Sequence, residues 1–137
     1  MAFVLRHSLL LIILGSLVIS TAMGLRHGFG LFMEPLSSEL GWGRGVFAFA
    51  LALQNLVWGL SQPFTGALAD RFGAARIIVV GGLLYALGLL FMSLSTSELG
   101  MTVSAGLLIG LGLSGTTFSV ILGAVGRAVA PEKRSMA

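Results

Sequence analysis

The stretch GALADRFGAAR, Gly66 to Arg76, joins two long apolar runs and decides the interpretation of the whole chain. It carries the adjacent opposite charges Asp70 and Arg71. Gly73 follows them, and because it has no Cβ it can adopt a positive φ in a tight turn at low cost. Charges that directly follow a long apolar run indicate where a helix leaves a bilayer. The stretch therefore predicts a short charged turn between two membrane-spanning helices.

The composition of the chain supports this interpretation. Of its 137 residues, 56% are hydrophobic and 9% are charged, whereas soluble domains carry about 25% charged residues. A run of about 20 apolar residues can cross the ~30 Å hydrocarbon layer as a helix, because a helix satisfies its own backbone hydrogen bonds. Four such runs predict an all-α membrane protein with helices at about 8–33, 46–69, 77–94 and 99–129. Short connectors make neighbouring helices antiparallel in one bundle.

Several other classes of protein are disfavoured. The net charge of +3 comes from scattered basic residues, which form no patch for a nucleic acid. The chain has no cysteine and its two histidines lie far apart, so it offers no local metal site. No nucleophile, base and orienting acid converge, so we expect neither an enzyme nor a cofactor. A cleaved signal peptide is the competing interpretation of the first run. This apolar run is longer than the roughly 7–15 apolar residues of a signal peptide, which favours a membrane span.

Positive charge predicts how the helices are oriented, because Lys and Arg concentrate on the cytoplasmic side of membrane proteins. Arg44 lies in a connector on one side of the predicted spans. The basic residues on the opposite side are Arg6, Arg71, Arg76, Arg127, Lys133 and Arg134. We therefore expect a multi-pass protein of the cell (inner) membrane, with both termini and the Gly66–Arg76 stretch in the cytoplasm.

The spacing Gly66-x-Leu68-x-Asp70-Arg71-x-Gly73-x-x-Arg76 between the second and third spans resembles the signature loop of the major facilitator superfamily of secondary transporters. The resemblance implies that the chain forms the first part of a twelve-helix fold, within its N-terminal half. It also implies a cytoplasmic gate that these loop residues help to latch. The gating residues would be Gly66, Asp70, Arg71, Gly73 and Arg76. A turn that only sets the topology, with solvated charges, is the alternative.

A second stretch, GFGLFMEPLSSELGWGRG from Gly28 to Gly45, resembles the first outer loop of the monocarboxylate and oxalate/formate branch of that superfamily. This resemblance favours a small organic anion as the substrate. Protons are a candidate coupling ion on separate grounds, because the histidine of the first predicted span could carry one. The fourth predicted span also lacks the mid-span arginine associated with drug/proton antiporters of the superfamily, which disfavours drug efflux.

Two residues of the first predicted span are candidates for the transport pathway. Arg26 and His27 follow a long uncharged run, and a charge at such depth normally faces a cavity or a partner. For Arg26 the alternative is snorkelling toward the outer headgroups. His27 shares a small polar face with Ser16 and Ser20 and could carry a proton. A helix-packing face with one hydrogen-bonded histidine is the alternative there.

The second and fourth predicted spans carry further candidates. Asn55 and Gln62 lie on one helical stripe with glycines, and we expect this stripe to avoid lipid. Both are pathway candidates, although hydrogen bonding between helices would also explain them. Gly106 and Gly110 form a Gly-x-x-x-Gly face, which favours close helix packing.

The resemblance covers nearly the whole chain but only about a third of a typical transporter of this kind. We therefore expect that residues 1–137 do not transport by themselves, because the C-terminal helices are missing. The alternative is a self-contained four-helix membrane subunit with a structural or assembly role. A small drug exporter would need a carboxylate in the first span, and residues 8–33 contain none.

Overall fold

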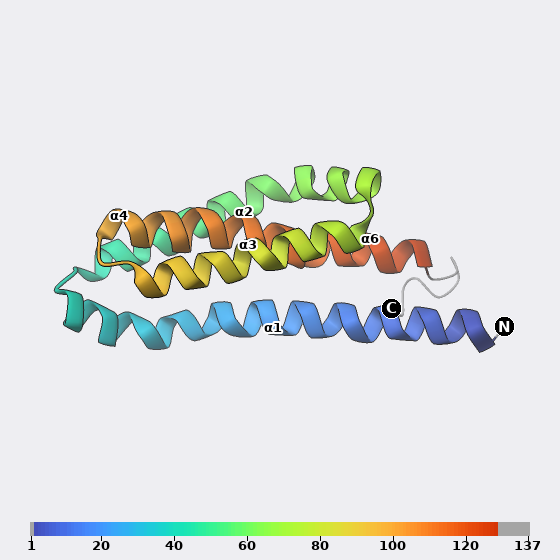
Figure 1. Cartoon of the computed structure of the whole chain (residues 1–137), viewed down its shortest axis with the longest axis horizontal. Helices are drawn as coiled ribbons and strands as arrows, with labels where there is room; N and C mark the ends of the chain where they lie inside the picture. Colours follow the sequence, from blue (N-terminus) through green and yellow to red (C-terminus); the bar gives the residue numbers. More distant parts are fainter. Residues whose placement is uncertain (1, 129–137) are drawn as a thin grey trace.

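The computed structural model describes residues 2–128 as a bundle of long helices (Figure 1). Four helical stretches are long and apolar enough to cross a membrane, namely Leu9–Pro35, Arg44–Phe72, Ala74–Leu94 and Glu98–Gly126. The start of α1, the α2–α3 turn and α6 lie at one end of the bundle in Figure 1, and the other two connectors lie at the opposite end. The predicted all-α architecture with four candidate spans is confirmed.

The first helix, α1 (Ala2–Leu40), extends beyond the predicted range of about 8–33 at both ends. It continues through Pro35, which the sequence analysis placed in the connector. Proline lacks the amide proton that would bond the carbonyl of Leu31, but Leu31 and Pro35 are both exposed, so the side of the helix that loses this bond is not covered by the rest of the bundle. The helix ends before Gly41, whose φ is +66°. The connector therefore consists of residues 41–43 alone.

A single residue separates α2 (Arg44–Phe72) from α3 (Ala74–Leu94). This residue is Gly73, with φ +94° and ψ 136°, and its N–H donates to the carbonyl of Ala69 at 3.0 Å. The positive φ is the conformation that the sequence analysis expected of this glycine. Both helices extend slightly toward the turn relative to the ranges 46–69 and 77–94.

The fourth span is interrupted, whereas the sequence analysis expected one helix over about 99–129. It consists of α4 (Glu98–Met101), the π-helix η1 (Thr102–Leu108), α5 (Ile109–Thr116) and α6 (Phe118–Ala128). Thr117 between α5 and α6 has an extended backbone, with φ −116° and ψ −165°. Hydropathy reports how apolar a segment is and carries no information about such interruptions. Residue 129 lies outside the described part of the chain.

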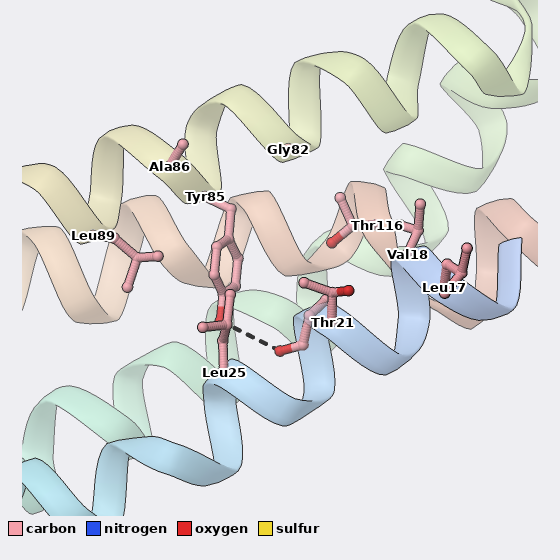
Figure 2. Close-up of a pocket in the computed structure, with 10 residues that line it drawn as sticks. Leu17, Val18, Thr21, Leu25, Gly82, Tyr85, Ala86, Leu89 and Thr116 are labelled. Carbon is pink, nitrogen blue, oxygen red and sulfur yellow. Dashed lines mark hydrogen bonds between the residues drawn. The ribbon is translucent and has the colours of Figure 1, made fainter. Parts of the chain in front are cut away.

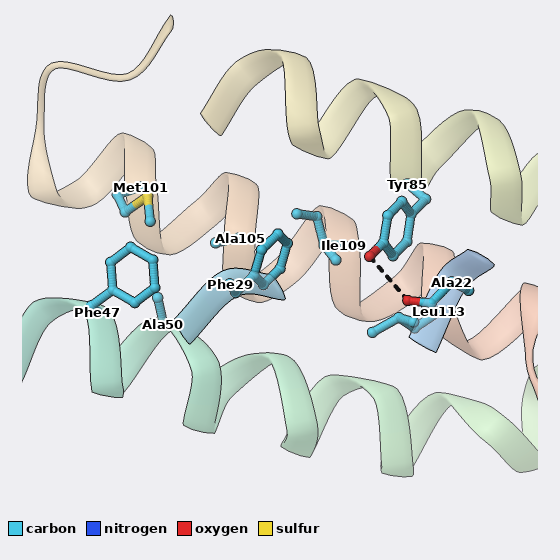
Figure 3. Close-up of a cluster of buried hydrophobic side chains, with 9 residues drawn as sticks. All are labelled: Ala22, Phe29, Phe47, Ala50, Tyr85, Met101, Ala105, Ile109 and Leu113. Atoms are coloured by element: carbon cyan, nitrogen blue, oxygen red, sulfur yellow. Dashed lines mark hydrogen bonds between the residues drawn. The ribbon is translucent and has the colours of Figure 1, made fainter. Parts of the chain in front are cut away.

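The fourth span forms the centre of the bundle. Ile109 and Leu113 of α5 are fully buried in an apolar cluster to which all four spans contribute (Figure 3). The third and fourth spans meet at their backbones, since a Cβ added to Gly112 would lie 2.6 Å from the nitrogen of Tyr85. Small residues allow this close approach of helices. Much of the remaining surface is apolar and exposed, as lipid contact requires.

Candidate functional site

The first and second spans meet in a polar contact around Arg26. Its Nη2 donates to Oδ1 of Asn55, and its Cζ lies 4.9 Å from the centroid of the Trp58 ring. Asn55 Nδ2 donates to the carbonyl of Leu51 at 2.9 Å, which fixes the amide with its oxygen toward α1. The structure therefore brings together Arg26 and Asn55, two of the four residues that the sequence analysis named as pathway candidates.

The charge of Arg26 is only partly compensated. Its side chain is half-buried, and no carboxylate among residues 2–128 pairs with it. Insertion scales assign about 2.5–3.5 kcal/mol to an arginine at the centre of a span, whereas a cation–π contact returns roughly 0.5–2 kcal/mol. A guanidinium has five N–H donors, and the bond to Asn55 engages one of them. The other N–H groups of the guanidinium are of a type that binds small anions.

The polar contacts continue from Trp58 to the fourth span. Trp58 Nε1 donates to Oγ1 of Thr117 at 2.9 Å, and the same hydroxyl donates to the carbonyl of Leu113 at 2.7 Å. Neither Trp58 nor Thr117 was among the candidates selected from the sequence. The spacing of Trp58 three residues after Asn55 was the available signal, because such residues share a helix face.

Gln54 is a buried polar residue that sequence reasoning also missed. Its side chain is fully buried, and neither its amide nitrogen nor its amide oxygen has a partner in the described part of the chain. An unsatisfied buried polar group costs about 1–3 kcal/mol. No local pattern separates it from Asn55, which follows it on an exposed part of the same helix.

The other two pathway candidates lie elsewhere. His27 is exposed, as are Ser16 and Ser20, so no described helix covers the polar face that the sequence analysis assigned to them. Gln62 is half-buried and does not approach Arg26; it lines a separate hollow that is described next. Within residues 2–128, His, Asp and Glu side chains form no cluster that could hold a metal ion.

The hollow at Gln62 lies between α2 and α6 and has a volume of about 600 Å³. Gly66 and Asp70 of the signature loop line it together with Ser119 of α6. A Cβ added to Gly66 would meet no described atom within 4 Å, so the space beside this glycine is open.

The remaining loop residues lie at the surface. Arg71 and Arg76 are both exposed, and Cζ of Arg71 lies 5.4 Å from the centroid of the Phe72 ring. Their charged groups can therefore reach headgroups or another segment of protein.

Gly106 and Gly110 lie against α2. A Cβ on Gly106 would come within 2.8 Å of Cδ2 of Leu53, and one on Gly110 within 3.0 Å of Cβ of Val57. The second and fourth spans consequently approach closely along the face that carries these two glycines.

An apolar cavity of about 410 Å³ lies between α1 and α3 (Figure 2). Leu17 and Leu25 of α1 and Leu89 of α3 supply much of its wall, and Thr116 lies beside it next to the break in the fourth span. Tyr85 crosses one side of the cavity, where its hydroxyl donates to the carbonyl of Ala22 at 3.3 Å. The cavity suits an apolar group with few polar atoms.

Comparison with known proteins identifies the family. Residues 10–137 match the model of the Major Facilitator Superfamily. Multidrug resistance protein MdtH of Photorhabdus laumondii is 41% identical over 87 residues, which are 64% of this chain and 20% of that protein. MdtH of Aeromonas hydrophila is 38% identical over 109 residues, 80% of this chain and 24% of that protein. The uncharacterized MFS-type transporter YhjX of Escherichia coli is 31% identical over 101 residues, 74% of this chain and 25% of that protein.

No solved structure gives a significant match. The chain spans about a quarter or less of the length of these curated relatives. The family expected from the signature loop between α2 and α3 is nevertheless matched along almost the entire chain. This chain belongs to the major facilitator superfamily, whose members are membrane transporters and not enzymes.

Proposed function

We propose that this chain supplies the first four helices of a secondary transporter that moves small organic anions by alternating access. The observation that carries the proposal is the half-buried cation Arg26, which faces α2 with no paired carboxylate among the described residues. A guanidinium binds carboxylates through two parallel hydrogen bonds, so it suits such a substrate. The resemblance of Gly28–Gly45 to the monocarboxylate and oxalate/formate branch points to the same class.

His27, next to Arg26, is our candidate for carrying a coupled proton. Imidazole is the side chain that ordinarily changes charge between pH 5 and 8. His27 is exposed on α1, and in this proposal it faces a water-filled route from which a proton can reach it. Asn55 and Gln62 then contribute amide groups to the wall of the route on α2.

The signature loop is proposed to latch the cytoplasmic side. The open space of about 600 Å³ beside Gly66 and Asp70 leaves room for a segment from the other half of a transporter. Gly73 holds the turn with its positive φ, and Arg71 and Arg76 present charge on the surface. Both chain termini lie in the cytoplasm in this proposal, on the same side of the inner membrane as the loop.

The test uses a full-length transporter that contains residues 1–137, reconstituted in proteoliposomes. We expect saturable uptake of radiolabelled oxalate, formate or lactate. Arg26→Gln should abolish it, and Arg26→Lys should retain a small part because lysine lacks the planar fork. Glu34→Gln, which removes a charge from another exposed residue of α1, should leave uptake intact. Uptake by Arg26→Gln at the original rate would remove the proposed anion site.

Export of drug-like molecules is the second candidate function. The lack of a mid-span arginine in the fourth span disfavours it, but the names of the MdtH relatives, which are multidrug resistance proteins, favour it. The apolar cavity between α1 and α3 also suits a lipophilic molecule. Ethidium export from the same proteoliposomes distinguishes the two functions. An exporter of cations would export ethidium at the same rate or faster after Arg26→Gln removes a positive charge.

We further infer that residues 1–137 do not transport by themselves. Alternating access requires a route that opens and closes between two halves of a protein, and this chain spans a quarter or less of its relatives. The competing function is a self-contained membrane subunit. Saturable, substrate-specific uptake by the purified 137-residue chain would overturn the inference of inactivity.

A further inference from the structure

A continuous series of side-chain contacts joins three spans of the bundle. It begins at the guanidinium of Arg26 on α1 and passes through the ring of Trp58 on α2. It ends at the hydroxyl of Thr117, where the fourth span loses its helical backbone. The ring face and the indole N–H of Trp58 therefore engage two different spans at once.

The hydroxyl of Thr117 is occupied on both sides. It accepts a hydrogen bond from Trp58 Nε1 at 2.9 Å and donates its proton to the carbonyl of Leu113 at 2.7 Å. Leu113 lies in the last turn of α5, where a helix leaves carbonyls without backbone partners. A rotation of the Trp58 ring would thus disturb a bond that caps the end of α5.

A second hydroxyl from α2 reaches the same helix end. Oγ1 of Thr65 lies 3.2 Å from the carbonyl oxygen of Ser114, and its single proton is shared between that oxygen and the carbonyls of Ser61 and Gln62, each 3.1 Å away. Two carbonyls near the break thus lie within hydrogen-bond distance of hydroxyl groups. In a membrane these bonds matter because no water is available to replace them. The bend of the fourth span therefore depends on where the α2 side chains lie.

We propose that Trp58 is a positioning residue that couples the side chain of Arg26 to the bend of the fourth span at Thr117. A ligand that engages the guanidinium competes with the Trp58 ring and with Asn55 for it. Such a ligand would interact differently with arrangements of the fourth span that keep or lose these contacts, which is the condition for shifting a conformational equilibrium. The proposal rests on the proposed function only for the identity of that ligand, a small organic anion.

The experiment measures the bend in the 137-residue chain in lipid nanodiscs, without substrate. The chain contains no cysteine, so two can be introduced for spin labels without removing any. Leu107→Cys and Leu122→Cys are suitable, because both leucines are exposed and they flank Thr117. A continuous helix would separate their backbones by about 22 Å at 1.5 Å per residue. Pulsed electron spin resonance reports how the labelled distance departs from a straight span.

Four further substitutions are made in this labelled chain. Trp58→Phe keeps a ring for the cation but removes the N–H, and Arg26→Gln removes the cation. We expect each to shift or broaden the distance distribution, and the double variant to resemble the single variants because both break the same series of contacts. Thr117→Ser keeps the hydroxyl and should leave the distribution unchanged. Trp42→Phe is the matched control at the other tryptophan and should change nothing.

The proposal is overturned if Arg26→Gln leaves the distribution unchanged while Trp58→Phe alters it, or if the two effects add. Circular dichroism and size-exclusion chromatography establish that each variant is folded. Should Trp58→Phe fail to fold, the comparison of Thr117→Val with Thr117→Ser, each with and without Arg26→Gln, decides the question in the same way. Because no substrate is present, failure here leaves the uptake test of the proposed function untouched, and the reverse also holds.

Discussion

Gly81 and Gly115 bring the third and fourth spans into backbone contact: a Cβ added to Gly81 would lie 2.9 Å from Cα of Gly115. The neighbouring Gly82 is exposed, and a Cβ there would meet no described atom within 4 Å. Two adjacent glycines on one helix thus differ in a single respect, namely whether another backbone lies against them. The pair separates the packing role of a glycine from its effect on helix propensity.

Gly81→Ala should destabilise the bundle and Gly82→Ala should not. Overpacking by one methyl group costs about 1–3 kcal/mol where the neighbours cannot yield. The three atoms nearest to a Cβ added at Gly81 all belong to the backbone of Gly112 and Gly115. Alanine at residue 82 should be neutral or stabilising by up to about 1 kcal/mol, since it favours the helix over glycine. Unfolding in SDS, followed by circular dichroism, measures both. Equal shifts for the two variants would contradict the observed packing.

The sequence predicted the features of this fold that depend on local composition. The four spans follow from runs of apolar residues, and the turn at Gly73 follows from a glycine between charged residues and the next apolar run. The predicted end of α1, at about residue 33, was too early, because the cost of Pro35 depends on whether the carbonyl it leaves unpaired can reach water, and no sequence pattern reports that. The break at Thr117 lies where side chains of Trp58 and Thr65 reach the fourth span, and both are distant from it in sequence.

The candidate site was predicted in part for the same reason. A charged residue such as Arg26 within an apolar run is a candidate functional residue from the sequence alone. An amide such as Asn55 on a helical stripe is a candidate for the same reason. Their contact requires the rotation of α1 relative to α2, which packing across the bundle sets. Gln54 and Asn55 are adjacent amides, yet one is fully buried and the other exposed. Only the orientation of α2 in the bundle distinguishes them.

Gln54→Met should stabilise the bundle. The substitution keeps the length of an unbranched side chain while it removes an amide that has no partner among residues 2–128. We expect a gain of about 1 kcal/mol or more in the free energy of unfolding, because a buried unsatisfied polar group costs about 1–3 kcal/mol. The same SDS titration measures it. Asn55→Leu is the matched change at the adjacent amide and should be destabilising, since it removes the bonds to Arg26 and Leu51.

A loss of stability in Gln54→Met would have a different meaning. It would show that the amide of Gln54 is satisfied in the membrane, for example by a buried water, and that this polar group contributes to the core.

Cysteine accessibility in intact cells should place the α2–α3 turn in the cytoplasm. Ala75→Cys in α3 and Thr96→Cys between α3 and α4 both introduce thiols at exposed residues on opposite ends of the third span. A membrane-impermeant maleimide should label residue 96 from outside and residue 75 only after permeabilisation, because the basic side of the bundle stays in the cytoplasm. Labelling of residue 75 in intact cells would reverse the proposed orientation and remove the basis for a cytoplasmic gate.

Asp70→Asn in a full-length transporter that contains residues 1–137 should slow transport and open the cytoplasmic side. The substitution keeps the shape of the side chain and removes the negative charge with which we propose that Asp70 holds the closed arrangement. Hydrogen bonds to charged groups contribute about 1.5–3 kcal/mol, which corresponds to a loss of about tenfold or more in a rate that depends on one of them.

Uptake in proteoliposomes measures the transport rate of Asp70→Asn. Maleimide labelling of a cysteine at Ala67, an exposed residue of the hollow between α2 and α6, measures the opening. Glu39→Gln, an exposed carboxylate at the opposite end of the bundle, is the matched control and should change neither. If Asp70→Asn transports at the original rate and labels at the original rate, the loop is a topological turn and the gate lies elsewhere.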